Sequence, residues 1–136
     1  MRDHRHELAQ AFLQKAQNDL FTARTTLAAH DGPTDTPCFH AQQAVEKALK
    51  ALLTIKGVVA PRTHDLLVLL DALPEAPPTV EPYRQTLGAL TAYAVEVRYP
   101  DDWYEPVRED AQNALKTAEA FVGLIVSMIE PIQTDH

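Results

Sequence analysis

The sequence predicts an all-α fold: an antiparallel up-and-down bundle of four long helices and one short helix. Apolar residues recur at steps of three and four through most of the chain, as on one face of a helix. No segment shows the period-two alternation between hairpin turns that is typical of strands. Short connections between the helical segments favour antiparallel neighbours. At 136 residues the chain has the size of one domain, so we expect a single core.

The first helix is predicted over residues 6–29. The run 31–33, Asp-Gly-Pro, is a turn signal that ends it. Its apolar residues form one stripe, made of Leu8, Phe12, Ala16, Leu20, Ala23 and Leu27. This stripe is expected to face the rest of the bundle.

The segment 37–57 is the helix around which the bundle is organised. Thr36 is its expected N-cap, Pro37 its first residue and Gly57 the left-handed residue that ends it. Small side chains let neighbouring helices approach to about 8 Å between axes, which places this helix inside the bundle. Its small and apolar positions are Ala41, Ala44, Val45, Ala48, Ala51, Leu52 and Ile55.

A short helix and a fourth long helix are predicted next. Thr63 is the expected cap of the short helix, which carries Leu66, Leu67, Leu69, Leu70 and Leu73. Four prolines between residues 74 and 82 predict a rigid loop. The fourth helix is expected from residue 81 or 83 to residue 97, before Pro100, and its buried residues are Tyr83, Leu87, Leu90, Ala94 and Val97.

The last helix is predicted to open with Asp102 as N-cap and Glu105 three positions later, the pattern of a capping box. Its apolar face is wider than one neighbouring helix covers, which predicts that a second subunit covers the rest. The positions are Val107, Ala111, Ala114, Leu115, Ala118, Phe121, Val122, Ile125, Met128 and Ile129.

Composition excludes several classes of protein. No apolar run approaches the roughly 20 residues of a membrane-spanning helix, and the first residues lack a signal-peptide core, so we expect a cytoplasmic protein. The single cysteine, Cys38, excludes an intrachain disulfide and a Cys-rich zinc site. No His/Glu spacing suits a metal, and no glycine motif suits a dinucleotide, so no metal and no cofactor are expected.

The net charge of −7 argues against a protein that coats nucleic acid, yet the charge is uneven. Between residues 36 and 64 Glu46 is the only acid, and it stands against four basic residues: Lys47, Lys50, Lys56 and Arg62. A small positive region on an acidic chain suits a localised anion such as a phosphate.

Polar residues at the ends of the middle helices are the candidate nucleotide- or anion-binding site. They are His40, Gln43, Lys47 and Lys50 on the central helix, His64 before the short helix, and Arg98, Tyr99 and Asp102 after the fourth helix. In this hypothesis Lys47, Lys50 and Arg98 hold phosphate and a tyrosine stacks on a base. In the alternative interpretation the same charges only solvate helix faces and helix ends.

Three segments, CFHAQQAVEKALKALL, THDLLVLL and YAVEVRYPDDW, resemble the signature segments of the HEPN domain family. The resemblance covers about residues 6–129, and it implies one HEPN-like domain over 1–136 with its core at about 6–130. It also implies a helical bundle that dimerises. Single-domain prokaryotic members commonly accompany a minimal nucleotidyltransferase in toxin–antitoxin-like pairs, and other members are metal-independent ribonucleases with an Arg, four to six residues, then His.

The chain departs from that ribonuclease motif. Arg98 resembles its first member, but no histidine follows before His136. Since histidine is the side chain suited to moving protons near neutral pH, no catalytic residue is assigned. The leading hypothesis is a non-catalytic homodimer that binds a nucleotide or RNA and partners a nucleotidyltransferase. The alternatives are an active ribonuclease toxin that takes an imidazole from His40 or His64, and a dimeric scaffold without ligand.

Overall fold

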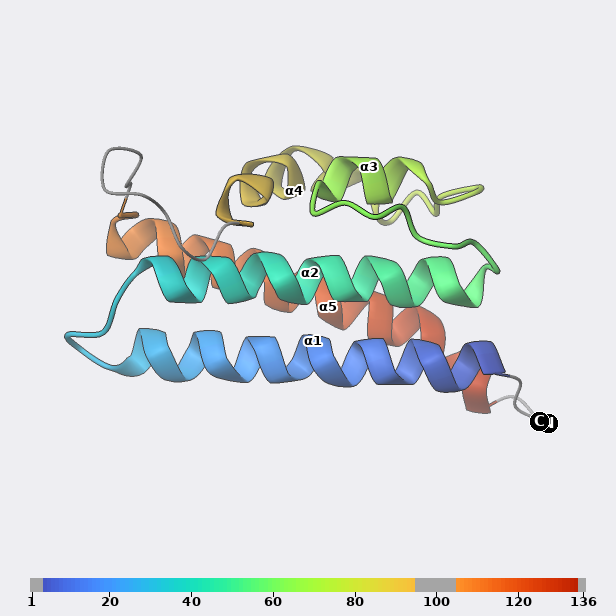
Figure 1. The fold of residues 1–136 in the computed structure, drawn as a ribbon, viewed down its shortest axis with the longest axis horizontal. Helices are drawn as coiled ribbons and strands as arrows, with labels where there is room; N and C mark the ends of the chain where they lie inside the picture. Colours follow the sequence, from blue (N-terminus) through green and yellow to red (C-terminus); the bar gives the residue numbers. More distant parts are fainter. Residues whose placement is uncertain (1–3, 95–104, 135–136) are drawn as a thin grey trace.

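The computed structural model describes residues 4–94 and 105–134, with side chains up to residue 130. Every regular element in those ranges is a helix, which confirms the predicted all-α bundle (Figure 1). The long helices are α1 (His4–Ala28), α2 (Asp35–Ile55) and α5 (Arg108–Thr134), and the short ones are α3 (Leu66–Asp71) and α4 (Arg84–Leu90). Single 3-10 turns at Glu81–Tyr83 and Thr91–Tyr93 flank α4.

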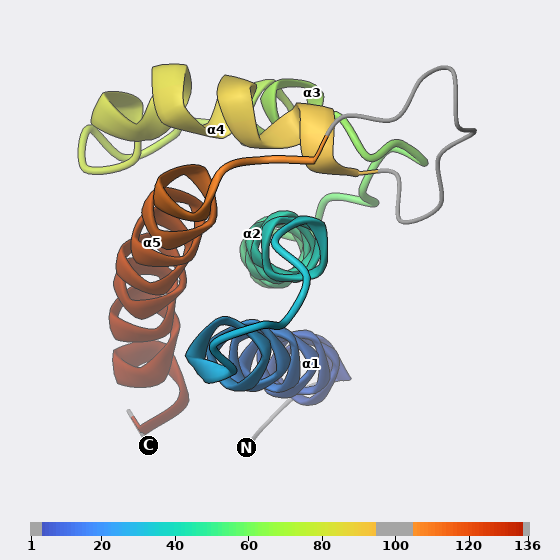
Figure 2. The same ribbon diagram turned by 90° about the vertical axis from the view of Figure 1, so that its left-hand side faces the viewer.

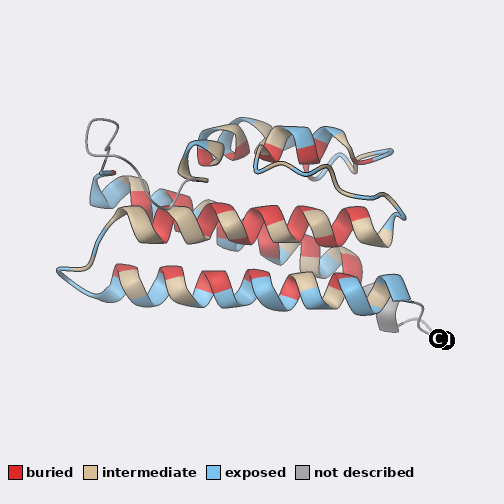
Figure 3. Cartoon of the chain, viewed as in Figure 1, coloured by how far each residue is buried: buried red, intermediate tan, exposed pale blue. Residues whose placement is uncertain are grey.

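Helix α2 lies in the middle of the bundle. Helix α1 runs antiparallel beside it, α5 packs on a second side, and α3 and α4 form a layer on a third (Figures 1 and 2). The predicted small positions explain this place, because Ala41, Ala44, Ala48 and Ala51 are all fully buried. Figure 3 shows buried positions along the length of α2, while the outer face of α1 is exposed.

Helix α2 begins two residues earlier than predicted. Its N-cap is Thr34 and its first residue is Asp35, so Thr36 lies inside the first turn. Pro37 is tolerated there because the first N–H groups of a helix have no partner within the helix. The Thr34 hydroxyl instead donates to the carbonyl oxygen of Pro106, at 2.5 Å. The N-cap side chain thus bonds to a distant segment and not to the first amides of its own helix.

The C-terminus of α2 is as predicted. Gly57 has φ +76°, the left-handed conformation. The amide of Val58 donates to the carbonyl of Leu53 at 2.9 Å, and the amide of Gly57 donates to that of Thr54 at 3.0 Å. These two bonds make a Schellman motif, which satisfies carbonyl groups that would otherwise lack partners at the helix end.

The predicted stripe of α1 is correct only from Ala16 onward. Nearer the N-terminus the buried residues are Ala9 and Leu13, whereas Leu8 is exposed and Phe12 is half-buried. Both sets have helical spacing, so periodicity alone does not choose between them. The position of α2 determines which set is buried, because α1 packs with its Ala9 side toward the core.

Helix α3 is capped by Asp65 and not by Thr63. The Asp65 carboxylate accepts from the amide of Leu67 at 3.0 Å, and the Thr63 hydroxyl accepts from the amide of Asp65 at 3.0 Å. Aspartate is at least as good an N-cap as threonine, and the chain here offers both. The leucines of the short helix and its end are buried as predicted, except for half-buried Leu67.

The fourth predicted helix is described up to Ala94, and regular α-helix covers only Arg84–Leu90, with a single 3-10 turn on either side. Pro82 lacks an N–H, and the chain around it forms a 3-10 turn in which the amide of Tyr83 bonds to the carbonyl of Val80. Leu87 and Leu90 are buried as predicted. Val97 and Pro100 lie outside the described residues.

Helix α5 starts at Arg108, so the predicted capping box is wrong. Residues 105–107 are not helical, and Asp102 lies outside the described residues. Pro106 accounts for the late start, since it disfavours helical angles at the residue before it. The Glu105 carboxylate lies 3.5 Å from the Thr34 hydroxyl instead, and Val107 is exposed rather than buried.

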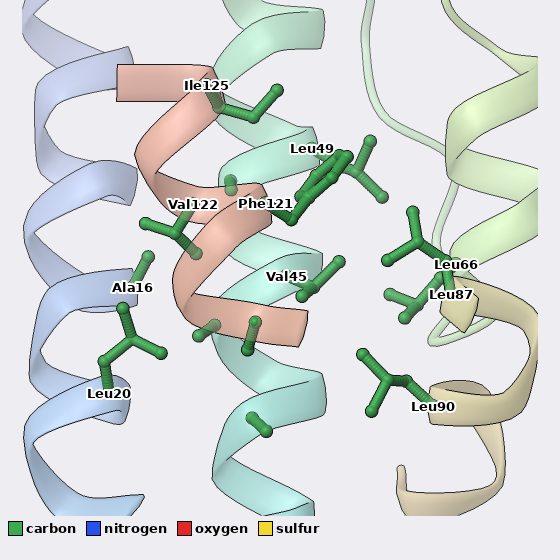
Figure 4. Close-up of a cluster of buried hydrophobic side chains, with 14 of the residues drawn as sticks. Ala16, Leu20, Val45, Leu49, Leu66, Leu87, Leu90, Phe121, Val122 and Ile125 are labelled. Carbon is green, nitrogen blue, oxygen red and sulfur yellow. The ribbon is translucent and has the colours of Figure 1, made fainter. Parts of the chain in front are cut away.

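The apolar face of α5 is covered within the chain. Phe121 is fully buried and its ring meets Tyr83 edge-on, with centroids 5.2 Å apart. Figure 4 shows it in one cluster with side chains from α1, α2, α3 and α4: Ala16, Leu20, Val45, Leu49, Leu66, Leu87 and Leu90. The reason given above for a second subunit is therefore wrong, because several neighbours share this face. The homodimer itself stays a prediction.

Candidate functional site

The predicted polar stripe lies on a part of α2 that the other helices leave partly exposed. We call it the α2 polar band: His40, Gln43, Lys47 and Lys50, all of intermediate exposure. Two buried carboxylates adjoin it, Asp19 of α1 at 8% exposed and Glu46 of α2 at 3% exposed. A buried carboxylate needs partners, and the band supplies them.

Asp19 binds one end of the band. Its Oδ2 accepts from Lys47 Nζ at 2.5 Å, and its Oδ1 lies 2.8 Å from His40 Nδ1. The antiparallel packing of α1 against α2 brings Asp19 between two residues that lie two turns apart on α2. The ion pair therefore also fixes how α1 lies along α2.

Glu46 binds the other end of the band. Its Oε2 accepts from Lys50 Nζ at 2.9 Å, and its Oε1 lies 2.8 Å from His64 Nδ1. Buried Gln42 donates to Oε1 at 3.3 Å and to the backbone carbonyl of His64 at 2.9 Å, which holds the turn before α3 against α2. Burial alone would raise the pKa of Glu46, but the bonds from His64 and Lys50 outweigh it and the pKa is lowered.

Two of the four basic residues in the positive region predicted from the sequence, Lys47 and Lys50, are neutralised by buried carboxylates. Asp19 and Glu46 supply two negative charges and Lys47 and Lys50 two positive charges, so these four sum to zero while the imidazoles are neutral. The sequence count of charges omitted Asp19 because it lies far from α2 along the chain. Each ammonium still has N–H groups beyond the one that bonds to its carboxylate, since lysine carries three donors.

Both histidines have a fixed tautomer. An ionised carboxylate only accepts hydrogen bonds, so Nδ1 of His40 and of His64 must carry the proton that faces Asp19 or Glu46. In the neutral ring Nε2 then holds a lone pair and acts as an acceptor. The His64 side chain is 68% exposed and that of His40 is 21% exposed. Each of these imidazoles can therefore donate to a ligand through Nε2 only after protonation.

Five of the eight predicted site residues gather at the band: His40, Gln43, Lys47, Lys50 and His64. Arg98, Tyr99 and Asp102 lie outside the described residues. Sequence reasoning missed Asp19, Gln42 and Glu46 as members of the site. A signal existed for Asp19, since an acid between Ala16 and Ala23 on the buried stripe of a helix needs a buried partner.

The part of the chain that the structure describes lacks two kinds of feature. It contains no group of three His, Cys, Asp or Glu side chains placed to hold a metal ion, and no helix there is long and apolar enough to span a membrane. Burial raises the pKa of the Cys38 thiol to about 11, against a smaller lowering by its bond to Tyr93. A thiol of this kind is protonated at neutral pH and is a poor nucleophile.

Comparisons with known proteins agree with this fold. The model of the HEPN domain matches residues 9–129. The chain is 27% identical to a protein of Methanocaldococcus jannaschii named "Putative toxin MJ1304", over 90% of this chain and 88% of that protein. It is similar to the crystal structure of TT1696 from Thermus thermophilus, with 32% identity, a TM-score of 0.75, and 88% of this chain and 96% of that chain covered.

A second solved structure, of ST0689, is described as an archaeal HEPN homologue. The TM-score is 0.69 at 27% identity, and the likeness covers 89% of this chain and 97% of that chain. The family model spans most of the sequence and includes all the helices that build the α2 polar band. This chain belongs to the HEPN domain family.

Proposed function

We propose that this HEPN protein is the toxin-like member of a toxin–antitoxin-type pair, and that it acts by binding a nucleotide or RNA and not by cutting RNA. Its likeness to a protein named as a toxin, over 90% of the chain, supports the first part. The observation that carries the second part is the lack of any histidine between Arg98 and His136. Without a histidine close after the arginine, the typical gain of 10²–10⁴-fold from general acid–base help near neutral pH is lost.

The α2 polar band together with Arg98 is the proposed binding surface. Lys47 and Lys50 are 27% and 24% exposed, and each is held on a buried carboxylate with donors to spare. A lysine held in place by its ion pair loses less conformational entropy when a phosphate binds. Arg98 would add a donor pair suited to phosphate.

The proposed partners are a second copy of the chain and a minimal nucleotidyltransferase. Purification of the tagged protein from its own cells, with identification of bound protein and nucleotide by mass spectrometry, tests the pairing. Co-purification of a nucleotidyltransferase that remains bound through gel filtration is the expected result. Recovery of the chain with neither a nucleotidyltransferase nor a nucleotide would favour the scaffold without ligand.

Nucleotide binding has its own test. Affinity should fall as salt is added, and each of Lys47→Ala, Lys50→Ala and Arg98→Ala should weaken binding about tenfold or more, because a charge-assisted contact contributes about 1.5–3 kcal/mol. Lys15→Ala on α1 is the control, since Lys15 is exposed and lies outside the band. If all four variants and the parent bind nucleotide with equal affinity, the band does not bind nucleotide and is only a solvated surface.

An active ribonuclease is the second candidate, and one observation favours it. His40 and His64 each have a ring nitrogen held 2.8 Å from a carboxylate oxygen, an arrangement that orients an imidazole as a general base. The test is incubation with labelled single-stranded RNA and tRNA in chelator, across about pH 5 to 9 around the ordinary histidine range. Cleavage lost in Arg98→Ala and in His40→Ala or His64→Ala would establish this candidate and remove the non-catalytic one.

A further inference from the structure

The carboxylate of Glu46 holds two different groups side by side. Lys50 Nζ contacts its Oε2 at 2.9 Å and His64 Nδ1 contacts its Oε1 at 2.8 Å. Gln43 Nε2 lies 3.5 Å from the same Oε1. Since one carboxylate joins them, an ammonium and an imidazole lie next to each other at the protein surface. We call these four residues the Glu46 cluster.

The hydrogen-bonding capacity that remains in this cluster is mixed. Lys50 has further N–H donors, whereas neutral His64 offers a lone pair at Nε2 because its Nδ1 proton faces Glu46. The lowered pKa of Glu46 keeps this acid ionised near neutral pH, so the tautomer does not invert. A ligand that contacts both groups must therefore accept from Lys50 and bring a proton to His64.

Phosphate groups differ in whether they meet this requirement. A phosphomonoester has a second ionisation near pH 6, so close to neutral pH it carries or readily takes up one proton. An internal phosphodiester of RNA has one negative charge, only acceptor oxygens and no proton to give. A diester oxygen that faces neutral His64 would lie against the lone pair of Nε2, and no hydrogen bond could form between them.

We propose that the Glu46 cluster binds a terminal phosphomonoester, as on a mononucleotide or an RNA end, and shares one proton between His64 Nε2 and a phosphate oxygen. This inference rests on the proposed function and adds the chemical class of the ligand. The same complex forms whether the proton arrives on the phosphate or on the imidazole. Internal phosphodiesters bind the cluster less well.

The charges around His64 support the discrimination. Glu46 and Lys50 face it from α2, and Asp65 adjoins it in the chain with its carboxylate on the amide of Leu67. Arg62 precedes His64 by two residues, so these four charges sum to zero while the imidazole is neutral. With protonated imidazole the sum is +1, and the imidazolium attracts a dianion more strongly than a monoanion.

His64 is the more accessible of the two histidines that contact a buried carboxylate, since its side chain is 68% exposed against 21% for His40. Replacing His64 by glutamine retains a donor for the Glu46 carboxylate and removes the titratable nitrogen. His30 provides the control, because it is exposed and lies outside the α2 polar band and the Glu46 cluster.

Calorimetric titration of the full chain with uridine 3′-monophosphate and with the methyl ester of that phosphate, at about pH 6.5, tests the proposal. We expect the parent and His30→Gln to bind the monoester about tenfold more tightly than the methyl ester, and His64→Gln to lose this preference. Thermal unfolding of each variant checks that it is folded.

The possible outcomes separate this inference from the proposed function. Equal binding of the two ligands by the parent, or a preference that persists in His64→Gln, overturns the inference and leaves nucleotide binding in place. A parent that binds neither ligand between about pH 5.5 and 8 overturns both.

Discussion

Replacing Glu46 by glutamine tests the energetic role of the buried carboxylate. The substitution keeps the shape of the side chain but leaves Lys50 without its partner and turns an amide toward His64 Nδ1–H. Removing one partner of a buried pair costs up to about 3–5 kcal/mol. Here the loss should be nearer 1–2 kcal/mol, because Lys50 and His64 are 24% and 68% exposed and water can solvate them.

The matched control is Glu119→Gln. Glu119 accepts from Arg24 at 2.9 Å in an exposed pair, for which a loss of about 0–1 kcal/mol is expected. Urea unfolding at neutral pH measures the free energy of unfolding of the parent and both variants. In thermal unfolding, Glu46→Gln should lower Tm by about 3–10 °C for a chain of this size.

The effect of Glu46→Gln should depend on pH. The pKa of Glu46 is lowered in the folded protein, so its stabilisation is complete above the pKa of the unfolded chain and is lost as pH falls through the folded value. The parent and Glu46→Gln should therefore differ fully at neutral pH and converge below the ordinary glutamate range, near pH 4. If Glu46→Gln is as stable as Glu119→Gln at neutral pH, or if its deficit persists in acid, the reasoning is refuted.

Three further predictions concern packing, the end of α2 and assembly. Phe121→Ala should lower the free energy of unfolding by about 3–5 kcal/mol, because the ring is fully buried among several helices; urea unfolding with a loss below about 1 kcal/mol would contradict that packing. Gly57→Ala should destabilise the protein by about 1 kcal/mol or more, since φ is +76° and a Cβ would lie 2.9 Å from the Arg5 guanidinium. Gly123→Ala is the control: it has open space around it in α5 and should stabilise the protein by about 0.5–1 kcal/mol. Equal changes in Tm for the two variants would contradict this. Sedimentation at micromolar concentration should give twice the chain mass of 15.1 kDa, and a monomer would remove the proposed homodimer.

The fold was predictable because its signals are local. The small residues of α2 indicated a central helix, and Gly57 indicated its end, since both depend on residues adjacent in the chain. Helix starts were less predictable. Three residues within a span of four could each mark the start of α2: Thr34, Thr36 and Pro37. The helix begins after Thr34, whose hydroxyl donates a hydrogen bond to the carbonyl of Pro106 in a distant segment.

The sequence predicted which residues of the site share one face of α2, but it did not predict the net charge of that face. Periodicity placed His40, Lys47 and Lys50 on one face, yet the net charge of that face depends also on Asp19, which only tertiary packing brings to it. Asp19 precedes Lys47 by 28 residues, so no local pattern joins them. The exchange of a positive face for a neutral one is therefore a property of the packing of α1 on α2.

The start of α5 is tied to the last turn of α1 and to the N-cap of α2 by two hydrogen bonds. Thr34 donates to the carbonyl of Pro106, and Arg108 donates to the carbonyl of Leu27, so the two bonds join residues that are 72 and 81 positions apart. Packing of α1 on α2 closes only a short connection, whereas these bonds form only after a long segment is ordered. The α1–α2 hairpin should thus fold early and the start of α5 should dock late. Thr34→Val would then accelerate unfolding and leave the folding rate almost unchanged.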